Sequence, residues 1–188
     1  MQCLARGCRL FSATRTRLLI TGNGTDRLGI VRDLSALIWA RQGNILESTM
    51  ARLSGEFVVL MLADIPVDKA ADLPFDLAGN KDLKGLNLTV RPASEDQIPV
   101  ASGDKWHLEV QGADHPGVLH ALADVLCRHD ISINDLTTCF EQAPLGGALL
   151  FRMHGCVQVP TRVDVEKVRK ELSQTSSALG VDTQFVAK

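Results

Sequence analysis

The residues best suited to bind a small charged molecule lie in two short segments that share one pattern. The first segment is Thr-Asp-Arg-Leu-Gly-Ile-Val at 25–31, and the second is Ala-Asp-His-Pro-Gly-Val-Leu at 113–119. In each segment an acid and a glycine directly precede a run of apolar residues at helical spacing. Backbone N–H groups at the start of a helix favour an anion, and a carboxylate can accept hydrogen bonds from an ammonium group. The pattern therefore indicates a site for a carboxylate or an amino acid.

The candidate ligand-binding residues comprise these loop positions and the residues that begin the strand after each helix. In the first segment they are Asp26, Arg27, Leu28, Gly29, Ile30, Asn44 and Ile45, and in the second they are Asp114, His115, Pro116, Gly117, Val118, Ser132 and Ile133. The glycines allow a ligand or a neighbouring chain to approach the backbone closely. The side chain of Asn44 can both donate and accept hydrogen bonds, which suits a zwitterion.

Each of these polar residues also has a purely structural interpretation. Asp26 and Asp114 can cap the helix that follows them instead of contacting a ligand. Asn44 can be a left-handed residue that ends the helix connection, and Arg27 and His115 can be solvated loop residues. Both interpretations remain open from the sequence alone.

The remaining reactive residues show no arrangement typical of an enzyme. No nucleophile stands beside a base at a recurring position, and no pair of carboxylates occurs in a pocket-forming context. The five cysteines include no CxxC pair, and the histidines outside the second segment are scattered along the chain. We therefore expect a non-catalytic protein that holds neither a metal ion nor a cofactor.

The two segments belong to a longer internal repeat. Asp26 aligns with Asp114 at an offset of 88 residues, and the same offset places Gly29 on Gly117. The apolar residues that follow keep this register, as Leu34 aligns with Leu122. A unit of about 75–80 residues therefore occurs twice, as expected for a duplicated supersecondary element.

Hydrophobic periodicity predicts the same order of elements in both repeats. The first repeat is expected to contain a strand at 18–21, a helix at 28–41, strands at 45–52 and 57–63, a helix at 67–78 interrupted by Pro74, and a strand at 86–90. The second is expected to contain a strand at 106–111, a helix at 116–129, strands at 133–140 and 148–154, a helix at 162–178 and a strand at 181–186. This order predicts an α+β protein of two ferredoxin-like βαββαβ units, each an antiparallel four-stranded sheet with its helices on one face.

Three local signals refine these predictions. The cluster Gly-Asn-Gly-Thr-Asp at 22–26 predicts a turn. Gly43 follows the first helix and is expected to be its left-handed cap. Pro116 is expected at the first helical position of the second repeat, where its missing N–H group costs nothing.

Composition divides the chain into four segments and suggests a compartment. We expect a leader or disordered segment at 1–16, units at 17–92 and 105–188, and a linker rich in Pro, Ser, Asp and Gly at 93–104. The leader is rich in arginine and lacks acids, which is typical of a mitochondrial or plastid transit peptide. The alternative is a frayed N-terminus on a cytoplasmic protein.

Charge and hydropathy exclude two classes of partner. The chain of 188 residues has a net charge of -2, so it lacks the basic excess expected of a protein that contacts nucleic acid directly. Its apolar runs are shorter than the roughly 18 residues needed to span a membrane. The open edges of ferredoxin-like sheets must be paired or protected, which favours a homodimer.

Several segments resemble a known family. Residues 22–31 (Gly-Asn-Gly-Thr-Asp-Arg-Leu-Gly-Ile-Val), 43–45 (Gly-Asn-Ile) and 50–57 (Met-Ala-Arg-Leu-Ser-Gly-Glu-Phe) resemble the ACT domain, a small regulatory module that binds amino acids. The tandem arrangement is similar to the glycine cleavage system transcriptional repressor family.

The resemblance implies a non-catalytic regulator that binds a small amino acid, with glycine as a candidate, at ACT-domain interfaces and controls a partner protein. The alternative is an interaction or oligomerisation module with a vestigial ligand site.

Overall fold

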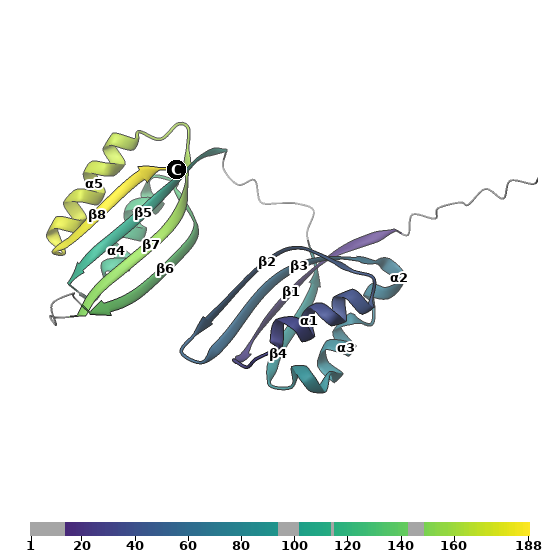
Figure 1. The fold of residues 1–188 in the computed structure, drawn as a ribbon. Coiled ribbons are helices and arrows are strands. Elements are labelled where there is room, and N and C mark those ends of the chain that lie inside the picture. The colour runs from purple at the N-terminus through teal and green to yellow at the C-terminus, as the bar shows by residue number, and fades with distance from the viewer. Residues whose placement is uncertain (1–13, 94–101, 114, 143–148) are drawn as a thin grey trace, which may run out of the picture. The chain divides into compact units, whose positions relative to one another are not determined.

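The computed structural model describes residues 14–93, 102–113, 115–142 and 149–188 (Figure 1). The chain divides into two compact units, one up to residue 95 and the other from residue 96. Asp114 lies outside the described residues, as do most of the expected leader and most of the expected linker.

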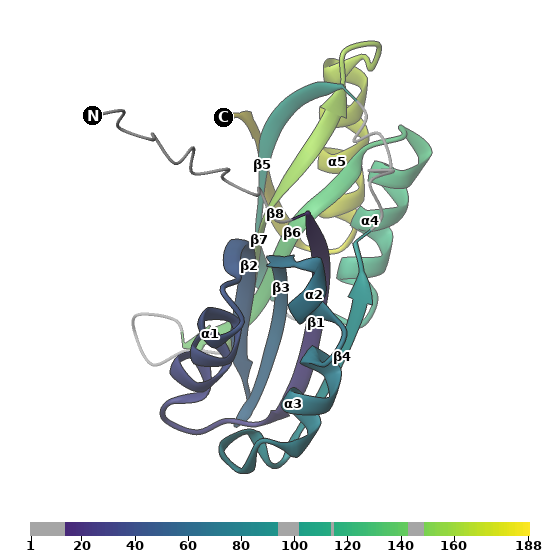
Figure 2. The same cartoon turned by 90° about the vertical axis from the view of Figure 1, so that its right-hand side faces the viewer.

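The first unit is a four-stranded antiparallel sheet with its helices on one face (Figure 2). Its elements are β1 (Arg15–Thr25), α1 (Ile30–Ala40), β2 (Asn44–Leu53), β3 (Glu56–Pro66), α2 (Val67–Ala70), α3 (Leu73–Gly79), the 3-10 helix η1 (Lys81–Leu83) and β4 (Leu86–Pro92). The strand order is β2-β3-β1-β4, so β2 and β4 are the edges.

The core of the first unit lies between the sheet and its helices. Alternate residues of β3 are buried, from Phe57 to Ile65, as expected for a strand with one face toward a core. From α1, Ile30, Leu34 and Ile38 are buried against them at helical spacing. The apolar stripe predicted from the sequence is therefore the face that packs on the sheet.

The second unit repeats this architecture. Its elements are β5 (Gly103–Ala113), α4 (Val118–Arg128), β6 (Ser132–Gln142), β7 (Leu149–Pro160), α5 (Val165–Ala178) and β8 (Val181–Ala187). The strand order β6-β7-β5-β8 matches that of the first unit. The predicted α+β class and the two ferredoxin-like units are confirmed. Every helix in the described ranges is too short or too polar to cross a membrane.

The predicted turn at 22–26 is wrong for most of its length, because β1 continues to Thr25. Gly22 and Gly24 are strand residues that lie close to β4. A Cβ atom on Gly22 would collide with the side chain of Leu88, and one on Gly24 would lie 2.9 Å from Leu86 Cδ2. These glycines are therefore needed for close packing between strands rather than for a turn.

Two helix boundaries also differ from the predictions. Pro74 lies in the first turn of α3 and so begins a helix instead of interrupting one. Pro116 lies two residues before α4, which has Gly117 as its N-cap residue. The positive φ of this cap, 94°, requires a backbone conformation that glycine adopts readily.

The end of α1 is closed by a different residue from the one predicted. The left-handed residue is Gln42, with φ of 56°, and its counterpart in the second unit is Asp130, with φ of 57°. Gly43 instead lies where the chain crosses the helix end, and a Cβ atom there would be 2.8 Å from Ile38 Cγ2 and 2.9 Å from Ile65 Cγ1. The lack of space for a side chain explains why this position is a glycine.

A β-bulge occurs at the same place in β2 and β6, which are corresponding edge strands of the two units. The register of β2 against β3 shifts between Ile45 and Glu47, and that of β6 against β7 shifts between Ile133 and Asp135. Each bulge adds one residue near the start of the strand and increases its local twist.

Candidate functional site

An open hollow of about 410 Å³ lies beside the loop that joins β1 to α1. Its lining includes five of the predicted ligand-binding residues, Asp26, Arg27, Leu28, Gly29 and Ile30, together with Val31, Arg52 and Phe57. The fold thus gathers the loop residues of the first repeat around one concave surface.

The backbone of this loop is fixed at both of its ends. The N–H group of Asp26 donates to the carbonyl of Gly55 at 2.8 Å, and the N–H group of Asp33 donates to the carbonyl of Gly29 at 2.9 Å. Gly29 has a φ of 96° and is the N-cap residue of α1. The loop therefore enters the helix through a conformation that a larger residue rarely adopts.

Asp26 does not cap the helix. No side chain caps α1, and the Asp26 carboxylate instead lies 3.6 Å from the guanidinium of Arg52 on β2. The capping interpretation is wrong for Asp26, while Asp114 lies outside the described residues.

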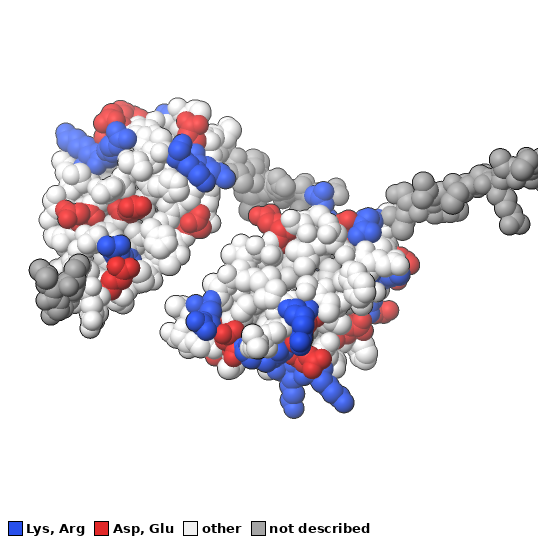
Figure 3. Space-filling model, in the orientation of Figure 1, with Lys and Arg blue, Asp and Glu red and all other residues white. Residues whose placement is uncertain are grey.

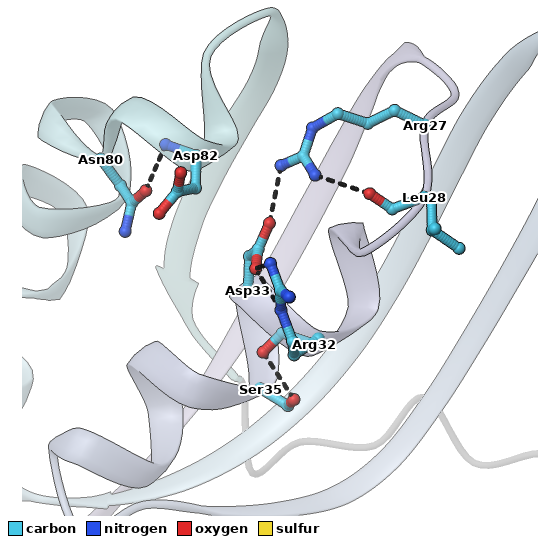
Figure 4. Close-up of polar contacts among 7 residues, drawn as sticks. All are labelled: Arg27, Leu28, Arg32, Asp33, Ser35, Asn80 and Asp82. Carbon is cyan, nitrogen blue, oxygen red and sulfur yellow. Dashed lines mark hydrogen bonds and ion pairs between the residues drawn. The ribbon is translucent and has the colours of Figure 1, made fainter.

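Arg27 belongs to an ion-pair network rather than to a freely solvated loop (Figure 4). Its Nη2 donates to Asp33 Oδ2 at 2.8 Å, and its Nη1 donates to the carbonyl of Leu28 at 3.0 Å. Arg32 donates through Nε to the other Asp33 oxygen, Oδ1, at 2.8 Å. The guanidinium of Arg27 is thus held by two acceptors while its side chain stays 37% exposed.

Asp33 does not line the hollow, but it contacts Arg27, which does, and it was not among the predicted residues. Its side chain is only 7% exposed, and the hydrogen bond from Arg32 holds the pKa of the carboxyl below its ordinary value. Burial opposes this shift, and the second hydrogen bond, from Arg27, supports it. A signal for Asp33 does exist, because it follows Ile30 by three residues and precedes Leu37 by four, which places an acid on the apolar face of a helix.

Asn44 and Ile45 lie far from the hollow of their own unit. Asn44 pairs with Asp64 at one end of β2, whereas Arg52 pairs with Phe57 at the other. Arg52 follows Asn44 by eight residue steps, which correspond to roughly 27 Å of strand. Asn44 begins the strand, and the left-handed residue of this connection is Gln42, so the left-handed interpretation of Asn44 is wrong.

The second unit has a different set of side chains at the equivalent positions. His115, Pro116 and Gly117 are exposed before α4, and Val118 is buried at its start. Ser132 and Ile133 begin β6, at the far end of that strand from Phe140. Phe140 occupies the place of Arg52 and packs edge to face on Phe151, with ring centroids 6.1 Å apart.

Two further hollows, of about 330 and 370 Å³, lie on the sheet of the second unit and share Glu109 and His154. Among the residues that the structure describes, no three His, Cys, Asp or Glu side chains could together hold a metal ion. On the face shown in Figure 3, acidic and basic side chains of the described residues are interspersed, without a broad basic patch.

The fold and the hollow define a tandem of small α+β modules, of which the first carries a charged site at its β1–α1 loop. The sequence matches the ACT domain over residues 16–91 and again over residues 108–186. The chain therefore belongs to the ACT domain family, and the two copies expected from the repeat are confirmed.

Three comparisons place the chain among known proteins. A UPF0237 protein from Methanosarcina mazei is 30% identical over 83 residues, which is 44% of this chain and 90% of that protein. The structure of an unknown protein from Galdieria sulphuraria is 28% identical with a TM-score of 0.82, over 93% of this chain and 99% of that one.

The third relative shares the tandem fold. This structure, provisionally assigned as a glycine cleavage system transcriptional repressor, has a TM-score of 0.66 and 20% identity. The match covers 93% of this chain and 98% of that chain. At this identity the likeness shows the fold alone.

Proposed function

We propose that this protein is a non-catalytic regulator that binds a small amino acid in the hollow of the first unit. The observation that carries the proposal is the charge arrangement of the lining. Arg27 and Arg52 offer guanidinium groups for a carboxylate, Asp26 offers an acceptor for an ammonium group, and Phe57 forms an apolar wall. An α-amino acid carries both complementary charges on a single carbon.

Glycine is the first amino acid to test. The related structure provisionally assigned as a glycine cleavage system transcriptional repressor shares the tandem fold, and ACT domains are regulatory modules. The regulatory character of this family also supports a protein without catalytic activity.

We propose that the site is completed by a second copy of the chain. The edge strand β2 has ten residues and no proline, while the opposite edge β4 has seven and ends in Pro92. If β2 pairs antiparallel with β2 of a second copy about its centre, Asn44 of one chain lies beside Arg52 of the other. This pairing joins the two parts of the predicted site and covers an exposed strand edge.

Binding is proposed to act on a partner protein through the helical face of the first unit. Trp39 on α1 and Phe75 on α3 are both 80% exposed, and exposed aromatic side chains are enriched at protein interfaces. A ligand at the N-terminus of α1 can change the affinity of this surface for the partner only if the ligand binds the free protein and the partner-bound protein with different affinities.

The acid-free, arginine-rich segment at 1–16 supports a proposal that the protein works in a mitochondrion or plastid. A fusion of residues 1–24 to a fluorescent protein tests this proposal. Replacement of Arg6 and Arg9 by glutamate is expected to abolish import into the organelle. A fusion that stays in the cytoplasm would favour the alternative compartment.

One observation favours the second candidate function, an interaction module with a vestigial ligand site. Arg27 and Arg52 already have acidic partners within the chain, Asp33 and Asp26. The charges of the hollow are therefore balanced without a ligand.

Thermal unfolding of the full chain against each of the twenty amino acids distinguishes the two functions. A ligand present at 100 times its Kd stabilises by about 2.7 kcal/mol. At roughly 2–4 °C per kcal/mol for a chain of this size, the midpoint is expected to rise by roughly 5–11 °C. Arg52→Ala is expected to remove the shift, and Arg91→Ala, which changes an exposed arginine on β4, is the control. Unchanged midpoints with all twenty amino acids would favour the interaction module.

A further inference from the structure

The two repeats differ at three charged positions in and beside the first hollow. At the repeat offset, Arg27 corresponds to His115 and Asp33 corresponds to Ala121. The backbone is the same at both places, since Ala121 N–H donates to the Gly117 carbonyl at 2.9 Å, as Asp33 N–H does to that of Gly29. The difference therefore lies in the side chains and not in the path of the loop.

The arginine and its buried acid are both absent from the second repeat. Asp33 makes no helix cap, and the first turn of α4 has no acid at all. An acid needed for the helix fold would be expected in both repeats. Asp33 holds two guanidinium groups, those of Arg27 and Arg32. At the repeat offset both arginines are histidines, His115 and His120. The acid is therefore present only in the repeat that has these arginines, and of the two only Arg27 lines the hollow.

The third charged residue, Arg52, corresponds to an aromatic residue in the second repeat, Phe140. Arg52 faces the hollow opposite Phe57, whereas Phe140 packs on Phe151 and is 56% exposed. An exposed phenylalanine offers a carboxylate no hydrogen-bond donor. Of the four charged residues Asp26, Arg27, Asp33 and Arg52, the second repeat keeps only the first, as Asp114.

We infer that the chain holds one amino-acid site and not two, and that Asp33 is the positioning residue of that site. This inference rests on the proposed function. Asp33 and the Leu28 carbonyl take one N–H group from each terminal nitrogen of Arg27. The remaining N–H groups of this guanidinium are left in a fixed orientation at the wall of the hollow. A donor held in place before binding loses less entropy when it captures a carboxylate.

An NMR titration of the 15N-labelled full chain with glycine, repeated with the other amino acids, tests the inference. Saturable shifts are expected for the backbone amides of residues 26–31, and none for those of His115, Gly117 and Val118. Arg27→His, Asp33→Ala and Arg52→Phe together make the first hollow like the second and are expected to abolish the shifts. The reverse graft of His115→Arg, Ala121→Asp and Phe140→Arg is expected to create saturable shifts at 115–118.

Asp33→Asn tests the positioning role separately. It is expected to weaken binding roughly tenfold, the effect of losing one hydrogen bond to a charged group. Gly43→Ala serves as the control, because it destabilises the same unit away from Arg27 and should leave the affinity unchanged. If Gly43→Ala weakens binding as much as Asp33→Asn does, the role of Asp33 is stability and not positioning.

Two outcomes overturn the single-site inference in different ways. Saturable shifts in both loops that survive the triple change in the first unit would refute one site per chain and leave amino-acid binding intact. No shift and no thermal stabilisation with any amino acid would refute the proposed function and the inference together. If the reverse graft does not fold, the wild-type titration and the first-unit triple variant still decide between these results.

Discussion

Asp33 shows how a buried charge in this protein is kept ionised by its neighbours. Arg32 and Arg27 each donate to a different oxygen of the carboxylate, and the hydrogen bond from Arg32 is the largest cause of its lowered pKa. Removing one partner of such a group leaves a charge without compensation, which destabilises more than losing an exposed ion pair does.

Replacement of Asp33 by asparagine is expected to lower the thermal midpoint in a pH-dependent manner. Because the pKa of Asp33 is lower in the folded state, its stabilising effect is complete above the ordinary value of 3.8. The effect is lost as the pH falls through the lowered folded value. Midpoints measured from neutral to acid pH should therefore show a deficit that narrows below about pH 4. Asp68→Asn, at an exposed position, is the control and should show no such trend.

The sequence could predict the loop residues of the site but not all of their partners. Asp26 to Ile30 follow one another in the chain, so their proximity needs no knowledge of the fold. Arg52 reaches the same hollow from β2 through strand pairing, and its role depends on which end of β2 lies beside the loop. The position of Asp33 on the apolar face of its helix could have been noticed in the sequence, but its partners Arg27 and Arg32 could not, because they meet at this carboxylate only in the folded structure.

At the scale of elements, the predicted order was confirmed in both units, and the errors occurred at glycine and proline. These residues break an element in one context and permit close packing in another. Gly22 lies in a strand because Leu88 leaves no room for a side chain, a constraint imposed by β4 more than sixty residues later. Local pattern alone carries no information on such a distant contact.

Gly43 allows a direct test of packing at the end of α1. Gly43→Ala is expected to destabilise the first unit by about 1–3 kcal/mol, because the new methyl group would overlap Ile38 and Ile65. Chemical denaturation followed by circular dichroism measures the effect. Gly79→Ala is the matched control, since no atom lies within 4 Å of a Cβ there, and it should be neutral or slightly stabilising. Equal losses in both variants would contradict the packing argument.

The exposed edge of β2 gives a second prediction at this scale. Ser48 lies near the middle of the strand, and in the two-fold antiparallel pair that sets Asn44 opposite Arg52 it faces its own copy. Ser48→Lys would bring like charges opposite each other and is expected to shift a dimer toward monomer in sedimentation experiments. Asn87→Lys on β4 is the control and should leave the dimer intact. Dissociation by Asn87→Lys alone would identify β4 as the pairing edge.

At the scale of the whole molecule, the two units have separate cores and one tryptophan each. Trp106 of the second unit stacks on Phe185 with ring centroids 4.9 Å apart, and Arg169 lies 5.3 Å from its ring. Trp39 of the first unit is largely exposed. The fluorescence of Trp106 should therefore change strongly when the second unit unfolds.

This difference allows the unfolding of the second unit to be followed separately from that of the first. In a Trp39→Phe background, Asp33→Asn is expected to lower the midpoint temperature of the first unit's contribution to circular dichroism. The midpoint temperature measured by Trp106 fluorescence, which reports the second unit, is expected to stay unchanged. Val168→Ala, which opens a cavity in the core of the second unit, is expected to shift the fluorescence transition to lower temperature. If Asp33→Asn shifts both signals equally, the chain unfolds as one cooperative body.

The β-bulge near the start of β2 and β6 has a historical consequence. It occupies the same place in both copies, although only the first copy has Arg27, Asp33 and Arg52. Two copies of one duplicated module would both carry such a bulge, so we infer that it predates the duplication. The bulge therefore belongs to the inherited scaffold, and the charged residues record how the descendants diverged.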